Sequence, residues 1–146
     1  MRWRNGPDGY EVMSKTLHWV TVPVLATQFV VGWSIDAADP SVPRAHIALG
    51  LLVLALGVVR VLWRRVGLPP WAEHLDQTAR RISAVTEKVL LSLLFAIPLS
   101  GLLLLEAGGG WLGLHIAAHV TFFAALTVHV ALMVAHARHG QLRRML

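Results

Sequence analysis

The residues from Leu114 to His139 constrain the fold more than any other part of the chain. They read LHIAAHVTFFAALTVHVALMVAHARH and overlap a run, Ala107 to Ala137, that contains no Asp, Glu, Lys or Arg. About 20 such residues are enough to cross a bilayer as a helix. An imidazole in lipid is costly unless it binds a partner. Five histidines nevertheless lie in this stretch: His115, His119, His129, His136 and His139. We therefore expect a membrane helix in which some of these histidines bind a ligand.

The spacing of two of these histidines is informative. His115 and His129 are 14 residues apart. At about 100° per residue this is roughly four turns, so the two rings point within about 40° of one another. They are separated by about 21 Å along the helix axis. One helix is therefore expected to offer one ligand to each of two sites, one near each membrane surface.

The composition also indicates a membrane protein. Of the 146 residues, 55% are hydrophobic and only 14% are charged, which is too apolar for a soluble domain of this size. The formal charge is +5, but the basic residues flank apolar spans, so we interpret them as a topology signal and expect no nucleic-acid partner. There is no cysteine, which excludes disulfides, cysteine-ligated iron–sulfur clusters and covalent haem attachment. A cofactor would have to be held by histidine.

The apolar segments predict an all-α fold, an integral membrane four-helix bundle that forms a single domain over residues 1–146. The spans are expected at about 14–35, 44–63, 84–105 and 114–137. Four spans place both termini on one side of the membrane. Of the 13 Lys and Arg residues, 12 lie in or next to the two terminal segments and the middle connection, and only Arg44 lies next to the other two loops. By the positive-inside rule, both termini are expected to be cytoplasmic.

This topology predicts which histidines share a depth. His18 begins the first span near the inner face, and His46 begins the second span near the outer face. The fourth span runs inward, so His115 is expected near the outer face and His129 near the inner face. The depths pair His46 with His115 and His18 with His129. Two histidines on facing helices suit the axial positions of a b-type haem, so we expect two non-covalent haem b groups.

His119 is the main ambiguity in this ligand set. It lies one turn from His115 and could replace it as a ligand. Around the helix axis, however, its ring is expected to point in a direction less close to that of His129. We expect it to lie beside a haem or to contact a propionate. Taken singly, His18 and His46 could instead be interfacial residues that stay hydrated. Zinc is less suited than haem, because no carboxylate or cysteine lies at a matching depth.

Other polar residues have weaker signals. Arg60 lies just inside the inner end of the second span, where it could pair with a haem propionate or extend its charge to the membrane surface. Gln28 is the lone amide in the middle of the first span and could hydrogen-bond across helices. The remaining histidines are expected to be solvated or have no assigned role: His136, His139 and His74.

The chain resembles the bacterial cytochrome b561 family of small four-helix, di-haem membrane cytochromes. The resemblance covers nearly the whole chain. It rests on KTLHW around His18, RAHIALG around His46, VVRVLWR around Arg60, AIPLSGLL around Pro98, and the spacing of His115 and His129. It implies axial ligands at His18, His46, His115 and His129, which agrees with the set reached from geometry, and a multi-pass location in the bacterial inner membrane.

The resemblance also implies electron transfer between an outer-side donor and a quinone, with ubiquinone as the expected acceptor. The best-understood activity in the family is superoxide oxidase, which takes an electron from superoxide and reduces ubiquinone. Here the segment between the third and fourth spans is shorter than in that type, and the outer loops carry Asp36, Asp39 and Glu106 against Arg44 alone, which would repel an anion. The alternatives are a haem-bearing anchor or electron-transfer subunit for a partner dehydrogenase, and a non-redox membrane protein.

Overall fold

The chain folds into four long helices in a computed structural model that describes residues 10, 12–35, 41–67, 75–107 and 109–136. A short 3-10 helix, η1 (Gly109–Trp111), leads into the last of them. The long helices are α1 (Val12–Trp33), α2 (Ser41–Arg64), α3 (Gln77–Ala107) and α4 (Leu112–Ala135). No strand occurs in these described ranges, and the all-α prediction is confirmed.

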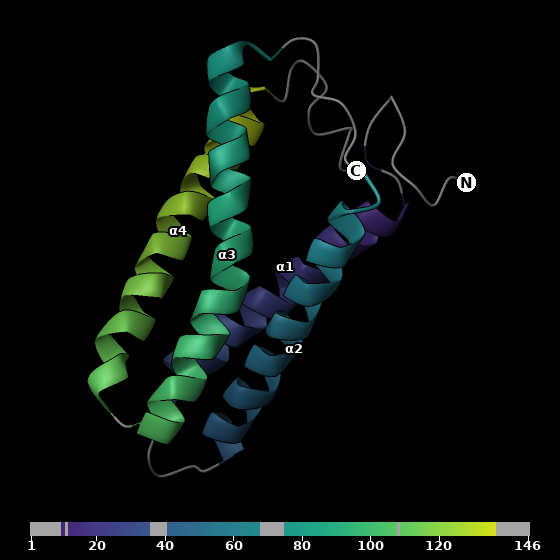
Figure 1. Ribbon diagram of the computed structural model, residues 1–146. Coiled ribbons are helices and arrows are strands. Elements are labelled where there is room, and N and C mark those ends of the chain that lie inside the picture. The colour runs from purple at the N-terminus through teal and green to yellow at the C-terminus, as the bar shows by residue number, and fades with distance from the viewer. Residues whose placement is uncertain (1–9, 11, 36–40, 68–74, 108, 137–146) are drawn as a thin grey trace.

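The helices run alternately in opposite directions (Figure 1). The start of α1, the end of α2, the start of α3 and the end of α4 lie at one end of the bundle, which we call the basic end. Its basic residues include Lys15, Arg60, Arg64, Arg80, Arg81 and Lys88. We call the other end, where η1 lies, the opposite end. The helices pair as α1 with α2 and α3 with α4, and contacts between α2 and α3 join the two pairs.

The lengths and compositions of the helices fit a membrane bundle. The segments Pro43–Arg64, Gln77–Ala107 and Gly109–Ala135 are long and apolar enough to cross a membrane. Helix α1 has 22 residues but is not among them, because Lys15, His18 and Gln28 lower its hydropathy. Large apolar side chains cover the outside of the bundle, and Trp33 is 90% exposed. An apolar exterior of this extent is suited to contact with lipid.

Helix α3 begins earlier than the sequence suggested. The expected start was near residue 84, whereas the helix starts at Gln77. Asp76 caps it, because its carboxylate accepts a hydrogen bond of 2.7 Å from the Ala79 N–H. The Arg80 Nε–H donates to the Leu75 carbonyl at 2.8 Å. This added part of α3 is polar, so a hydropathy pattern does not detect it.

Two helices, α2 and α4, place chemically distinct residues along their inward faces. On α2 the residues His46, Gly50, Val53, Gly57 and Arg60 follow one another at spacings of three and four, which keeps them on one face. On α4 the inward face extends from His115 to His129. Halfway along the bundle, side chains of α1, α3 and α4 form an apolar layer, which includes Leu25, Phe29, Leu93, Ile97, Ala118 and Phe122. The layer separates the histidines at the two ends.

Candidate functional site

The first histidine pair joins α2 to α4 toward the opposite end of the bundle. The ring centres of His46 and His115 are 6.4 Å apart, and the ring planes are inclined at 83°. Each ring lies against a glycine. A Cβ atom on Gly32 would lie 2.7 Å from His46 Cε1, and one on Gly101 would lie 3.2 Å from His115 Cε1. The two glycines therefore leave the space that the imidazoles occupy.

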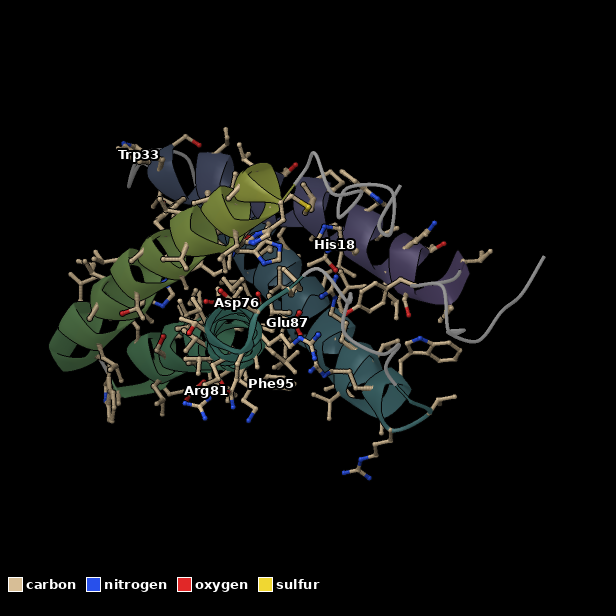
Figure 2. All side chains as sticks on the ribbon, turned by 90° about the horizontal axis from the view of Figure 1, so that it is seen from above. His18, Trp33, Asp76, Arg81, Glu87 and Phe95 are labelled. Carbon is tan, nitrogen blue, oxygen red and sulfur yellow. The ribbon has the colours of Figure 1, made fainter. Side chains whose placement is uncertain are left out.

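The second histidine pair joins α1 to α4 toward the basic end. The ring centres of His18 and His129 are also 6.4 Å apart, with the planes at 43°. Seen from the basic end, His18 lies inside the bundle, whereas Arg81 lies on its outside (Figure 2). The Arg60 Nε–H donates to Thr21 Oγ1 at 3.3 Å. Because Thr21 is one turn from His18 on α1, the Arg60 guanidinium lies beside this pair.

Both separations suit a metal ion held between two imidazoles. A bond from a metal to an imidazole nitrogen is about 2 Å, and the ring centre lies about 1 Å farther, so two rings on opposite sides of one metal have centres about 6 Å apart. No group of three or more His, Cys, Asp and Glu residues that could hold a metal ion occurs in the described part of the chain. Isolated pairs are therefore better suited to haem iron, which needs only axial ligands from the protein, than to zinc.

Side chains of α1 and α3 form hydrogen bonds with the two rings of the first pair. His115 Nδ1 lies 2.9 Å from Ser100 Oγ on α3. Gln28 Nε2 on α1 lies 3.4 Å from His46 Nε2, so the predicted hydrogen bond of Gln28 across helices is confirmed. Gln28 Oε1 and His46 Nδ1 are buried without hydrogen-bond partners. Unsatisfied buried polar atoms are rare and often mark a place where a ligand or water belongs.

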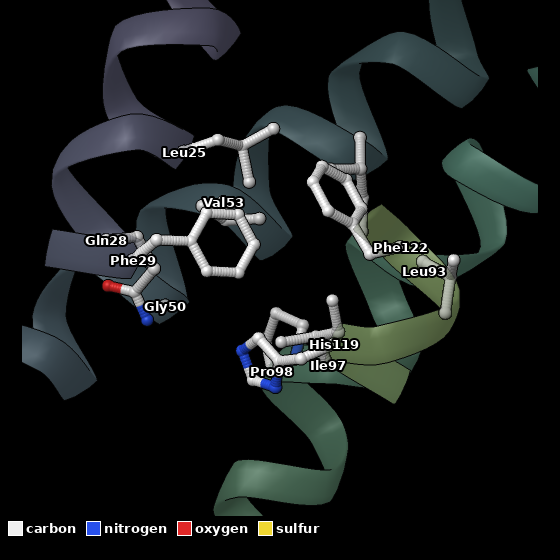
Figure 3. Close-up of a pocket in the computed structure, with 11 residues that line it drawn as sticks. Leu25, Gln28, Phe29, Gly50, Val53, Leu93, Ile97, Pro98, His119 and Phe122 are labelled. Carbon is white, nitrogen blue, oxygen red and sulfur yellow. The ribbon is translucent and has the colours of Figure 1, made fainter. Parts of the chain in front are cut away.

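His119 lies next to the first pair rather than opposite either ring. Its ring centre is 4.4 Å from that of His115, which is too short for two imidazoles on opposite sides of one metal. Its Nδ1–H donates to the His115 carbonyl at 2.7 Å, and its ring packs against the edge of Phe29 at 5.3 Å. Together with Gln28, His119 supplies the polar part of a cavity that is otherwise lined by apolar side chains and Gly50 from all four helices (Figure 3).

The other polar residues considered from the sequence are not part of these pairs. His136 follows α4, is half-buried, and donates from Nδ1 to the Leu132 carbonyl at 2.8 Å. Glu106 is exposed near the end of α3. Four further residues named above lie outside the described part of the chain: Asp36, Asp39, His74 and His139.

Several residues around the rings were not identified from the sequence. Gly32 is 14 residues after His18, so helical spacing places it on the same face of α1, at the depth of the other pair. A small residue at that spacing is the signal that could have revealed it. Ser100 and Gly101 belong to the AIPLSGLL segment, whose contact with His115 depends on how α3 is rotated against α4. That rotation cannot be read from the period of one helix.

A bundle of apolar helices that encloses paired histidines at two depths is the architecture of a helical membrane cytochrome. The chain matches the family model described as prokaryotic cytochrome b561 over residues 9–146, and it belongs to that family. It is 32% identical over 116 residues to cytochrome b561 homolog 2 of Escherichia coli (strain K12). The matched region covers 75% of this chain and 62% of that relative's length. No solved structure matches the chain.

Membership of this family implies a membrane cytochrome that binds b-type haem. The geometry of the histidine pairs agrees with that cofactor, since each pair leaves room for one metal between its rings.

Proposed function

We propose that the protein binds two haem b groups, one between His46 and His115 and the other between His18 and His129. The observation that supports this most strongly is that both pairs have a ring-centre separation of 6.4 Å. Helix α4 contributes one ligand to each pair, and its 14-residue spacing separates the two sites by about 21 Å along the axis. Haem b held by these pairs would supply a one-electron carrier at each site, suited to electron transfer rather than to chemistry at the iron.

The residues around the pairs have distinct roles in this proposal. Histidine nitrogens from two facing helices would hold the iron. The apolar layer excludes water between the sites, and Phe29 and Phe122 lie in it with ring centres 5.3 Å apart. Arg60 supplies a positive charge beside the His18–His129 pair, where a haem propionate would form a charge-assisted bond with it. His119 has no axial role and contributes to the wall of the cavity beside the first pair.

The proposed reaction moves electrons from a donor on the outer side of the bacterial inner membrane to ubiquinone. The basic end faces the cytoplasm in this arrangement, in agreement with the positive-inside rule. A quinone accepts two electrons and two protons to become a quinol, so two single-electron donations complete one turnover. The whole sequence, residues 1–146, is proposed to act as one membrane domain with lipid and quinone as its partners.

The haem content of the purified protein tests this proposal. A pyridine haemochrome assay is expected to give two haem b per chain, and a redox titration two one-electron waves. Both haems should be six-coordinate and low-spin. Protein reduced with dithionite should be reoxidised by a soluble ubiquinone analogue under anaerobic conditions. One haem or none per chain would overturn the two-site proposal, and haems that stay reduced with the quinone analogue would overturn the acceptor.

A further inference from the structure

Ser100 is a buried polar residue on α3, the one long helix without a histidine, and it is only 3% exposed. Its hydroxyl lies 2.9 Å from the Ile97 carbonyl and 2.9 Å from His115 Nδ1. A serine hydroxyl has one hydrogen to donate, and a carbonyl oxygen can only accept. The hydroxyl therefore donates to Ile97, and its oxygen accepts a hydrogen bond from the His115 Nδ1–H.

This arrangement determines the tautomer of His115. A neutral imidazole that carries its hydrogen on Nδ1 has the free lone pair on Nε2, and that lone pair is what a metal binds. The neighbouring residue, Gly101, lets the ring lie against α3, because a Cβ there would come 3.2 Å from His115 Cε1. Adjacent residues of α3 thus set both the protonated nitrogen and the position of the ring.

The other ring of the same pair is held differently. His46 Nδ1 is buried and has no hydrogen-bond partner. The contact from Gln28 reaches His46 at Nε2, over a longer distance of 3.4 Å. The first pair is therefore asymmetric, since the His115 Nδ1–H has an acceptor at 2.9 Å and the corresponding atom of His46 has none.

We propose that Ser100 is a positioning residue for the outer haem, which holds His115 with Nε2 toward the iron and lowers the reduction potential of that haem. This rests on the proposed ligation of haem by His115. An acceptor for the distal N–H of a metal-bound histidine fixes its orientation and raises its basicity as a ligand. A more basic ligand stabilises ferric over ferrous iron. Removal of the acceptor should therefore raise the potential of this haem and leave the other haem unchanged.

The test is a redox titration of the purified, haem-loaded full chain, followed by its visible spectrum. Ser100→Ala should shift the outer-haem wave to a more positive potential, while Ser100→Thr, which keeps a hydroxyl, should remain close to wild type. Ser92→Ala is the matched control, since Ser92 lies on the exposed side of the same helix. A His18→Ala variant, which should retain only the outer haem, assigns the wave.

Each result separates this inference from the function on which it rests. A wild-type protein without two haem waves contradicts the proposed function itself. Two wild-type waves that Ser100→Ala leaves unmoved, or that Ala and Thr shift equally, overturn the role of Ser100 alone. Loss of only the outer haem in Ser100→Ala, restored by Thr, supports positioning. Loss of both haems overturns it, because Ser100 would then act in folding.

Electron paramagnetic resonance of the ferric outer haem is a second measurement. The spectrum should change in Ser100→Ala and should match that of the wild type in Ser100→Thr. A Ser100→Ala spectrum identical to that of the wild type would overturn the positioning role.

Discussion

Gly32 on α1 and His46 on α2 lie so close that a Cβ atom at position 32 would be 2.7 Å from Cε1 and 2.9 Å from Nδ1 of the imidazole. Such distances are shorter than non-bonded carbon contacts in a packed interior, which have their optimum at about 3.5–4.0 Å. Any side chain at this position must therefore displace the ring or separate the two helices.

Replacement of this glycine should affect one haem and not the other. We expect Gly32→Ala to lower the occupancy of the haem held by His46 or to shift its potential, since overpacking of a filled site costs about 1–3 kcal/mol. The haem held by His18 should be retained. Haem content and a two-wave redox titration measure both effects. Gly113→Ala is the control, because a Cβ at Gly113 meets no atom within 4 Å. An unchanged spectrum and titration in Gly32→Ala would contradict the assigned contact.

The second prediction is that substitutions of two ligands of the same haem are not additive in their effects on that haem. His46→Ala and His115→Ala should each disturb the outer haem, and combining the two should disturb it no further, because both ligands belong to one site. His18→Ala combined with His115→Ala should disturb both haems. Haem stoichiometry and the low-spin spectrum of each variant are the measurements.

The control for this series is His119→Ala, which should leave both irons six-coordinate. His119 Nδ1 donates to the His115 carbonyl, and its ring is only 4.4 Å from that of His115. A high-spin signal in His119→Ala, with a normal spectrum in His115→Ala, would show that His119 is the ligand instead.

Arg60 is expected to raise the potential of the inner haem. Its guanidinium is held by Thr21, one turn from His18, and a nearby positive charge favours the reduced iron. Arg60→Leu should lower that potential by on the order of 1 kcal/mol, which is tens of millivolts for one electron, or reduce haem occupancy. Arg81→Leu, at an exposed position on α3, is the control. Identical titrations of the two variants would indicate that Arg60 acts only at the membrane surface.

The donor can be identified by stopped-flow spectroscopy. If superoxide is the donor, a superoxide pulse should reduce the haems, and added ubiquinone should accelerate their reoxidation. Glu106 is exposed near the opposite end, so the encounter with an anion should become faster at higher ionic strength and, by a few-fold, in Glu106→Gln. If the haems stay oxidised under superoxide but are reduced by quinol or by a co-purifying protein, the result would instead favour the alternative that the protein is an electron-transfer subunit of a partner dehydrogenase.

The sequence predicted the features that depend on one helix at a time. The all-α bundle follows from the apolar segments, and the proximity of His46 to His115 and of His18 to His129 follows from the helical period combined with alternating direction. The contacts that depend on how two helices pack were not predicted. The hydrogen bond of Ser100 to His115 requires a particular rotation of α3 against α4, and several rotations bury an equally apolar face. The early start of α3 was missed because the first residues of this helix are polar and the hydropathy pattern does not detect them.

The position of both histidines on α4 makes this helix intolerant of insertions. Adding one residue between His115 and His129 would turn one ring by about 100° relative to the other and lengthen their separation by only about 1.5 Å. Removing seven residues would keep both rings close to one face but bring the sites about 10.5 Å nearer to each other. Variation in length among relatives should therefore accumulate in the connections, while the number of residues between these two histidines stays constant.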